Sequence, residues 1–235
     1  MLRVLNTGIA SAEENMAFDA RLLDALEKEP ILHLYQWAGP SATYGYFIAP
    51  EKHLDLAAAQ KYRLSLARRP TGGGIIFHIW DLAFSFLLPS SHPSFSLNTL
   101  ENYRFVNEVV LEVMKGFFAI RGPVELAASA PAAASDCQNF CMAKPTQFDV
   151  IYKGMKIAGA AQRKRKQGYL HQGTISLALP QIELLNDVLL SKKEVPAAML
   201  AYTYAPLGRV WEPRALKEAR SEIGLLLARK FMAKL

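Results

Sequence analysis

RRPTGGGIIFH, residues 68–78, places two arginines before three consecutive glycines and then returns to an apolar run. Glycine has no Cβ, so it lets another group approach the main chain closely. Backbone amides beside fixed positive charge suit a phosphate or a carboxylate. A glycine triplet taken alone is equally what an ordinary tight turn requires. The stretch therefore predicts strands on both sides of a glycine turn, and it makes that turn a candidate anion site.

The composition is that of a globular chain that can bury a core. Of its 235 residues, 51% are hydrophobic, which is enough for one domain, or for one domain with a small appendage. The longest apolar runs fall well short of the roughly 18 residues that span a bilayer. The N-terminal segment turns acidic where a secretory signal would be apolar. We therefore expect a cytoplasmic protein without a membrane span.

Positive charge is in excess, with a formal net charge of +6. Such an excess favours an acidic partner, which could be nucleic acid, a phosphorylated cofactor or an acidic protein. The densest basic run, Arg163 to Lys166, falls at an expected hairpin tip and lacks the interleaved aromatic residues of a single-strand binding platform. The pattern thus argues against a nucleic-acid-binding protein.

The order of predicted elements indicates an α+β fold rather than a doubly wound sheet. Ser11 and Glu14 form a capping box that begins a helix over about residues 11–28. Residues 127–135, which are small and featureless, are assigned to a loop just before the cysteines. The other expected elements are strands at 31–37, 42–46, 64–69, 75–78 and 82–88, a short helix from Pro50 to about Tyr62, and a helix capped at Asn98 whose core face holds Val106, Val109, Val110, Val113 and Phe117.

A second informative stretch is FDVIYKGMKIAGAAQRKRKQGYLHQGTISLAL, residues 148–179. Glycine suits the two-residue turns Lys153-Gly154 and Gln167-Gly168, so we expect three antiparallel strands. Simple alternation along the middle strand puts Lys156, Ala158, Ala160 and Gln162 on one face and Ile157, Gly159 and Ala161 on the other. The run of small residues leaves a groove that fits a long acyl chain, with Lys156 at its polar end. As a strand lysine, Lys156 is expected to contribute little to stability.

Three ordered motifs together carry a resemblance to a known family. RRPTGGGIIFH followed by LAFS, then DVIYKGMKIAGAAQRK with HQGTIS, and the helical SAEENMAFDARLL resemble the lipoate–protein ligase A family, which shares its fold with biotin ligases and octanoyl transferases. The resemblance covers roughly residues 1–190. It implies a biotin/lipoate ligase-like catalytic domain, with a central, mostly antiparallel sheet flanked by helices and a tunnel for lipoyl or octanoyl chains. Residues 191–235 would then be a C-terminal helical extension of the same domain.

The resemblance also implies an activity and a set of site residues. The substrate would be lipoate or octanoate, as free acid or acyl thioester, and the acceptor a lysine on the lipoyl domain of a 2-oxoacid dehydrogenase E2 subunit or of the glycine cleavage H protein. Lys156 would stabilise charge as the acyl carbonyl is attacked. The aspartate that follows the motif histidine in the ligases is Ile79 here, with Asp81 two positions later, and this departure weakens any role that the resemblance assigns to the aspartate. By similarity, the substrate-binding residues are Arg69, Gly73, Gly74, Ile75, Ile76, Phe77, His78, Ala158, Gly159, Ala160 and His171.

The family contains two chemistries. Its ligases use ATP and Mg²⁺ to form an acyl-adenylate, and many carry a small additional C-terminal domain that is longer than residues 191–235. Its octanoyl transferases take the acyl group from a thioester, such as that of an acyl carrier protein, onto a cysteine in a C-x-x-x-P-[ST] setting. Cys141 with Pro145 and Thr146 fits that setting, and a cationic neighbour such as Lys156 would favour its thiolate.

We therefore expect protein lipoylation through a Cys141 thioester. ATP-dependent ligation stays open as an alternative, and so does a non-catalytic acyl-binding protein. Two cysteines four residues apart are a poor zinc signature, so Cys137 is interpreted as a bystander and no metal is expected.

Overall fold

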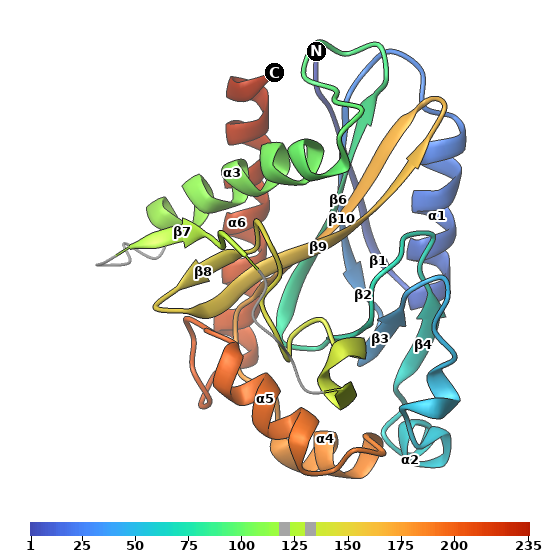
Figure 1. The fold of residues 1–235 in the computed structure, drawn as a ribbon, viewed down its shortest axis with the longest axis vertical. Helices are drawn as coiled ribbons and strands as arrows, with labels where there is room; N and C mark the ends of the chain where they lie inside the picture. Colours follow the sequence, from blue (N-terminus) through green and yellow to red (C-terminus); the bar gives the residue numbers. More distant parts are fainter. Residues whose placement is uncertain (118–122, 130–134) are drawn as a thin grey trace.

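Two β-sheets and the helices around them make up the computed structural model, which describes residues 1–117, 123–129 and 135–235 (Figure 1). The larger sheet has the order β1-β2-β6-β10-β9-β8-β7, and the smaller has the order β4-β3-β5. The strands are β1 (Arg3–Ala10), β2 (Ile31–Trp37), β3 (Ser41–Tyr44), β4 (Ser65–Arg68), β5 (Ile75–His78), β6 (Asp81–Pro89), β7 (Val124–Leu126), β8 (Val150–Tyr152), β9 (Met155–Arg165) and β10 (Gly168–Ser176).

Strand directions confirm the predicted α+β class. Within the larger sheet only β1 and β2 run parallel, and every other neighbouring pair is antiparallel. In the smaller sheet β3 runs parallel to β4 and antiparallel to β5. The mostly antiparallel central sheet expected from the sequence is thus present.

Helices cover both faces of the larger sheet (Figure 1). α3 and α6 pack against one face, where valines of α3 that the sequence pattern assigned to the core, such as Val106 and Val110, are buried. α1 lies on the other face, between the larger sheet and the smaller one. The helices are α1 (Ala12–Asp24), α2 (Leu56–Lys61), α3 (Thr99–Phe117), α4 (Ile182–Val188), α5 (Glu194–Tyr202) and α6 (Pro213–Lys234), with 3₁₀ turns η1 (Pro50–Lys52) and η2 (Ser135–Asn139).

Several local predictions hold and others need correction. The capping box at Ser11 is present, although its helix ends at Asp24 rather than near residue 28. The helix expected from Pro50 to Tyr62 is divided into η1 and α2, because the Asp55 side chain caps a new helix start by accepting from the Ala58 amide. Of the loop predicted at 127–135, residues 130–134 lie outside the described residues.

The second hairpin turn, predicted at Gln167-Gly168, lies one residue earlier. Arg165 pairs with Gly168, so the two turn residues are Lys166 and Gln167, and Gly168 is the first residue of β10. A Cβ on Gly168 would lie 2.1 Å from the carbonyl oxygen of Leu88. Glycine is needed here for close strand approach rather than for the turn itself.

The predicted alternation along β9 is wrong, because the pairing of β8 with β9 shifts at a bulge. Val150 faces Ala158, but the next residue, Ile151, faces Lys156. The extra residue of β9 lets Ile157 and Ala158 both enter the main core, and it brings Lys156 onto the side of Gly159. The groove therefore has different walls from those that a regular period of two would give.

No helix among the described residues is long and apolar enough to cross a membrane.

Candidate active site

The site is a narrow cavity between the two sheets that opens in part to solvent. Its inner wall is mostly small or apolar, and its cationic side chains are Arg69 and Lys156. This combination suits a chain that is apolar at one end and polar at the other. The lining residues are Met16, Tyr35, Thr43, Arg69, Ile76, His78, Ala83, Cys141, Lys156, Gly159, Ala160, Ala161, Gln172, Gly173 and Thr174.

The glycine turn of RRPTGGGIIFH makes room for the segment that carries Cys141. A Cβ on Gly74 would lie only 2.3 Å from the carbonyl oxygen of Asn139 and 2.5 Å from its carbon. Just beyond, the Cys141 amide donates to the carbonyl oxygen of Ile75 at 3.0 Å. The bare backbone at Gly74 thus admits a second stretch of backbone, and this close contact fixes the position of Cys141 beside the cavity.

Gly73 lies at the meeting point of the thiol and a buried cation. Its φ of +85° is in the left-handed region that favours glycine. A Cβ there would be 3.3 Å from an Nη atom of Arg69 and 3.8 Å from Cys141 Sγ. Burial lowers the pKa of Arg69, and the neighbouring Cys141 sulfur partly opposes that shift. An arginine remains protonated despite such a shift, so a fixed positive charge stands beside the thiol.

Arg69 is held by four hydrogen bonds. Its Nη1 donates to the carbonyl oxygen and to Oγ1 of Thr43, at 2.9 and 2.8 Å. Its Nη2 donates to the carbonyl oxygens of Gly72 and Gly74, at 3.1 and 2.7 Å. These bonds occupy both protons of each Nη nitrogen, so Nε–H is the donor left for a thiolate or a substrate oxygen.

Lys156 is buried, with 3% of its surface exposed, and it forms an ion pair with Asp149. Its Nζ lies 2.8 Å from Asp149 Oδ2 and 2.9 Å from the carbonyl oxygen of Cys141. An ammonium has three protons, so one remains for a group in the cavity. The expectation that Lys156 contributes little to stability is wrong, because removing it would leave the buried Asp149 carboxylate without its cation.

Thr146 and Tyr103 complete the shell around Asp149. The Thr146 amide and hydroxyl both donate to Asp149 Oδ2, at 2.6 and 2.8 Å. The Tyr103 hydroxyl, from α3, donates to Oδ1 at 2.7 Å and accepts from the Ala160 amide at 2.7 Å. Burial and the Asp149 charge raise the pKa of Tyr103 well above its usual value, which keeps this hydroxyl protonated. Thr146 of the C-x-x-x-P-[ST] motif thus acts on Lys156 through Asp149.

The structure brings together most of the candidate residues and separates four. Cys141, Lys156, Arg69, Ile76, His78, Gly159 and Ala160 all line the cavity. Gly73 and Gly74 contact its lining residues: Gly73 lies against Arg69 and Cys141, and the Gly74 carbonyl oxygen accepts from Arg69. Ile75 and Phe77 point into a second apolar cluster, as does Cys137, while Ala158 lies in the main core.

His171 is fully buried away from the cavity, beside Gln162 and Phe84. Burial lowers its pKa to about 3, so it is neutral at physiological pH. Its surroundings are those of a core residue, and it is not among the side chains that line the cavity.

Sequence reasoning missed several side chains of the site because they come from separate elements. Met16 of α1, Tyr35 of β2, Thr43 of β3 and Gln172 of β10 line the cavity together. Asp149 is not among the site residues predicted from the sequence, although an acidic residue just before the Lys156 hairpin is a usable signal for an ion pair. Among the described residues, no three His, Cys, Asp or Glu side chains come together as metal ligands.

The fold is that of enzymes that transfer acyl groups to proteins. Residues 11–200 match the family model described as the lipoyl protein ligase A/B catalytic domain, and the chain belongs to that family. Its similar proteins include the octanoyltransferase LipM of Lysinibacillus sphaericus, which is 31% identical over 203 residues, covering 83% of this chain and 72% of the relative.

Solved structures share the fold. A crystal structure of lipoate-protein ligase A bound with ATP superimposes with a TM-score of 0.71 at 25% identity, covering 99% of this chain and 84% of the other. A bipartite lipoate protein ligase from Thermoplasma acidophilum, studied with its E2 lipoyl domain, gives a TM-score of 0.72 at 22% identity, covering 99% of this chain and 82% of the other.

Proposed function

We propose that the protein transfers an octanoyl group from a carrier thioester to the lysine of a lipoyl domain, through an acyl thioester on Cys141. The observation that carries this proposal is that Arg69 and Lys156 both lie beside Cys141, in a cavity whose walls are mostly small or apolar. Similarity to octanoyltransferases LipM supports the same chemistry. Lipoyl and octanoyl chains both have the shape that such a cavity accepts.

In the first step, the Cys141 thiolate attacks the carbonyl carbon of the donor thioester. The new bond joins Cys141 Sγ to that carbon, the bond to the carrier sulfur breaks, and the carrier leaves as a thiol with the proton that Cys141 gave up. Arg69 stabilises the thiolate before attack. The third proton of Lys156 and the Nε–H of Arg69, which the bonds described above leave unused, then serve as donors to the oxyanion that forms.

In the second step, the target lysine amine attacks the Cys141 thioester. An amide bond forms, the bond from the acyl carbon to Cys141 Sγ breaks, and the amine gives up one proton as the thiolate is released. The same donors serve this step because the acyl carbonyl keeps its place. Neither step consumes ATP.

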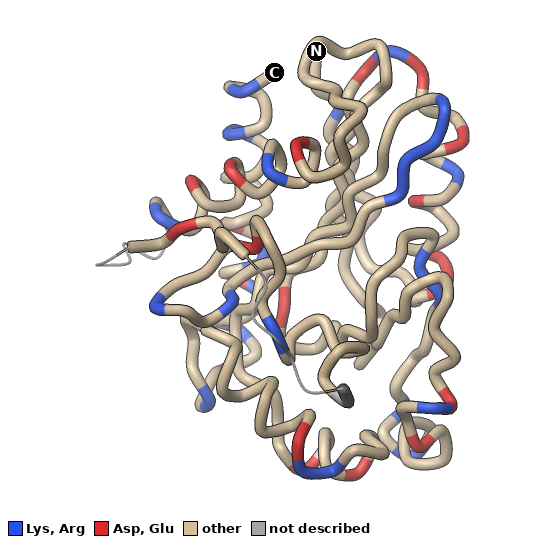
Figure 2. Tube along the Cα trace, viewed as in Figure 1, with Lys and Arg blue, Asp and Glu red and all other residues tan. Residues whose placement is uncertain are grey.

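The partner we propose is an acidic lipoyl domain, of a 2-oxoacid dehydrogenase E2 subunit or of the glycine cleavage H protein, with an acyl carrier protein as donor. Figure 2 shows positive charge gathered along the far end of the β9–β10 hairpin, which carries Arg163, Lys164, Arg165 and Lys166. Arg163 is fixed there by donating to the carbonyl oxygen of Pro70 at 2.7 Å, just beyond Arg69. The hairpin, whose positive charge would attract an acidic lipoyl domain, is thus bonded to the loop that borders the cavity.

ATP-dependent ligation is the second candidate, favoured by the likeness to lipoate-protein ligase A bound with ATP. A two-donor assay separates the candidates. The protein is mixed with a lipoyl domain and either octanoyl carrier protein alone or octanoate with ATP and Mg²⁺, and the domain is weighed by intact mass. We expect acylation from the carrier without ATP. Acylation only from octanoate with ATP would overturn the proposal in favour of a ligase, and acylation from neither donor would favour an acyl-binding protein.

A further inference from the structure

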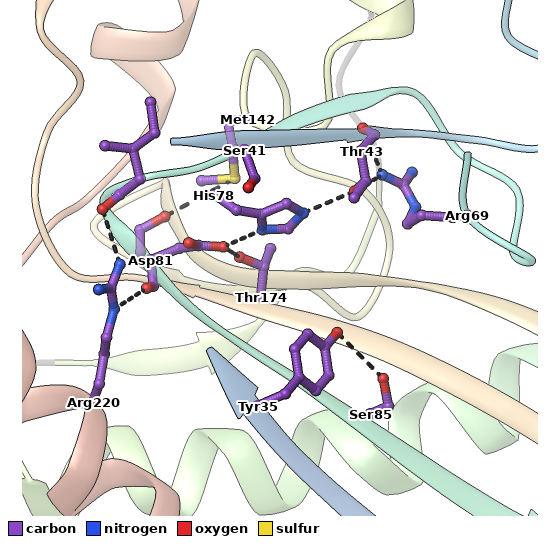
Figure 3. A network of polar contacts seen from close by, with 12 residues as sticks. Tyr35, Ser41, Thr43, Arg69, His78, Asp81, Ser85, Met142, Thr174 and Arg220 are labelled. Atoms are coloured by element: carbon purple, nitrogen blue, oxygen red, sulfur yellow. Dashed lines mark hydrogen bonds and ion pairs between the residues drawn. The ribbon is translucent and has the colours of Figure 1, made fainter. Parts of the chain in front are cut away.

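Behind Arg69, a line of buried polar groups crosses from the smaller sheet to the larger one (Figure 3). Thr43 Oγ1 lies 2.8 Å from His78 Nε2, and His78 Nδ1 lies 2.7 Å from Asp81 Oδ2. Thr174 of β10 donates to the same Asp81 oxygen at 2.6 Å. With the Arg69 to Thr43 bonds, these contacts form one continuous chain, which we call the Arg69 chain: Arg69, Thr43, His78 and Asp81.

One direction of donation satisfies every member of the Arg69 chain. An arginine only donates and a carboxylate only accepts, so the two ends are fixed. Arg69 donates to Thr43 Oγ1, the Thr43 hydroxyl donates to His78 Nε2, and Nδ1–H of His78 donates to Asp81. In this arrangement Nδ1 of His78 carries the proton that Asp81 accepts. Trp37 supports the His78 ring by stacking on it at 4.2 Å.

The C-terminal helix α6 anchors the Asp81 end of the Arg69 chain. Arg220 donates from Nε to the carbonyl oxygen of Asp81 at 2.7 Å and from Nη2 to that of Ile79 at 2.9 Å. These bonds pin the turn between β5 and β6, which carries Asp81 two positions after the place where the related ligases have their aspartate. The position of Asp81 is therefore fixed by a helix, α6, that lies outside both sheets.

We propose that Thr43, His78 and Asp81 are positioning residues that aim the Arg69 guanidinium at Cys141 and so keep the thiolate available. This inference rests on the proposed role of Cys141. Thr43 is the critical member, because its side chain joins Arg69 to His78 while its carbonyl oxygen holds the other Nη1 proton. Without the hydroxyl, the guanidinium loses one of its four fixed bonds and can turn away from the sulfur.

Other charges around the sulfur do not make the chain redundant. The titratable groups that line the cavity with Cys141 are Arg69, Lys156, His78 and Tyr35. Lys156 already donates two of its three protons, to Asp149 and to the Cys141 carbonyl oxygen. Tyr35 is kept neutral because burial raises its pKa well above the usual value. A change in the orientation of Arg69 can therefore alter how much of Cys141 is thiolate without breaking the ion pair between Lys156 and Asp149.

The test measures alkylation of Cys141 by iodoacetamide as a function of pH, with peptide mapping to separate Cys141 from Cys137. Thr43→Val keeps the shape of the side chain and removes the hydroxyl. At pH 7 we expect alkylation of the Thr43→Val protein to be roughly tenfold slower than in the wild type, which is the effect of losing about one charge-assisted hydrogen bond. The pH at which the alkylation rate rises should also be higher in this variant. Thr43→Ser should restore the wild-type profile. Ser41→Ala is the matched control, since Ser41 is a buried residue on the same strand whose hydroxyl, within the described residues, donates to the Gly39 carbonyl oxygen at 3.0 Å.

Asp81→Asn tests the chain from its other end, so the outcome does not depend on Thr43→Val alone. We expect it to shift the profile in the same direction, and the double variant to lose little more than either single variant, because all act through Arg69. A wild-type profile in a folded Thr43→Val or Asp81→Asn protein would overturn the inference, as would additive losses in the double variant. No acyl donor is used, so this result is independent of whether Cys141 carries an octanoyl group.

Discussion

Gly74→Ala should disable the enzyme by moving the segment that carries Cys141. The added Cβ would lie 2.3 Å from the carbonyl oxygen of Asn139, whereas ordinary contact begins at 3.4 Å. Relief requires a shift of about 1 Å in backbone that lies two residues before the nucleophile, and a misplacement of this size costs roughly 10²-fold in rate. The strain should also lower the free energy of unfolding by about 1–3 kcal/mol.

Gly72→Ala is the matched control, because a Cβ at that position in the same loop meets nothing within 4 Å. The assay is the initial rate of octanoyl transfer to a lipoyl domain, together with urea unfolding of each variant. We expect Gly72→Ala to stay near the wild-type rate while Gly74→Ala falls by roughly 10²-fold. Equal rates for the two variants would refute the claim that Gly74 sets the position of Cys141.

Three further results are expected. Lys156→Met should abolish transfer and lower the free energy of unfolding by about 3–5 kcal/mol, measured by urea unfolding, and adding Asp149→Asn should restore part of the stability but no transfer. The pKa of His171 is lowered to about 3 in the folded protein, so below pH 6.5 the unfolded chain binds one more proton than the folded chain, and the free energy of unfolding falls as the pH drops toward 3. At pH 5 this loss is about 2 kcal/mol, and it should be absent in His171→Asn. Raising the salt concentration should raise the Michaelis constant for a lipoyl domain more than for a short neutral peptide acceptor, and an equal effect on both would exclude steering by residues 163–166.

The sequence predicted the sheet because its strands are rich in branched and aromatic residues and its turns carry glycine. It also located Cys141 and Lys156, since each lies in a motif that can be read locally. It failed at the β9 bulge, because one extra residue in a strand leaves no trace in a periodic pattern. Gly159 therefore lines the cavity, whereas Ala158, which was predicted to face it, lies in the main core.

The role of the glycine triplet could not be predicted, because it depends on a contact between residues far apart in the sequence. Gly74 faces Asn139, and no local pattern links the two. The same holds for the Arg69 chain, whose members come from β3, β5 and β6 and the loop after β4. Tertiary packing, rather than propensity, decides which polar groups meet in a buried site.

Trapping the acyl-enzyme tests the central claim most directly. The protein is mixed with octanoyl carrier protein in the absence of any acceptor, and its intact mass is measured before and after hydroxylamine. We predict one octanoyl group that hydroxylamine removes, retained by Cys137→Ala and absent from Cys141→Ala. Full transfer to a lipoyl domain by Cys141→Ala, with no adduct on the wild-type protein, would contradict the account.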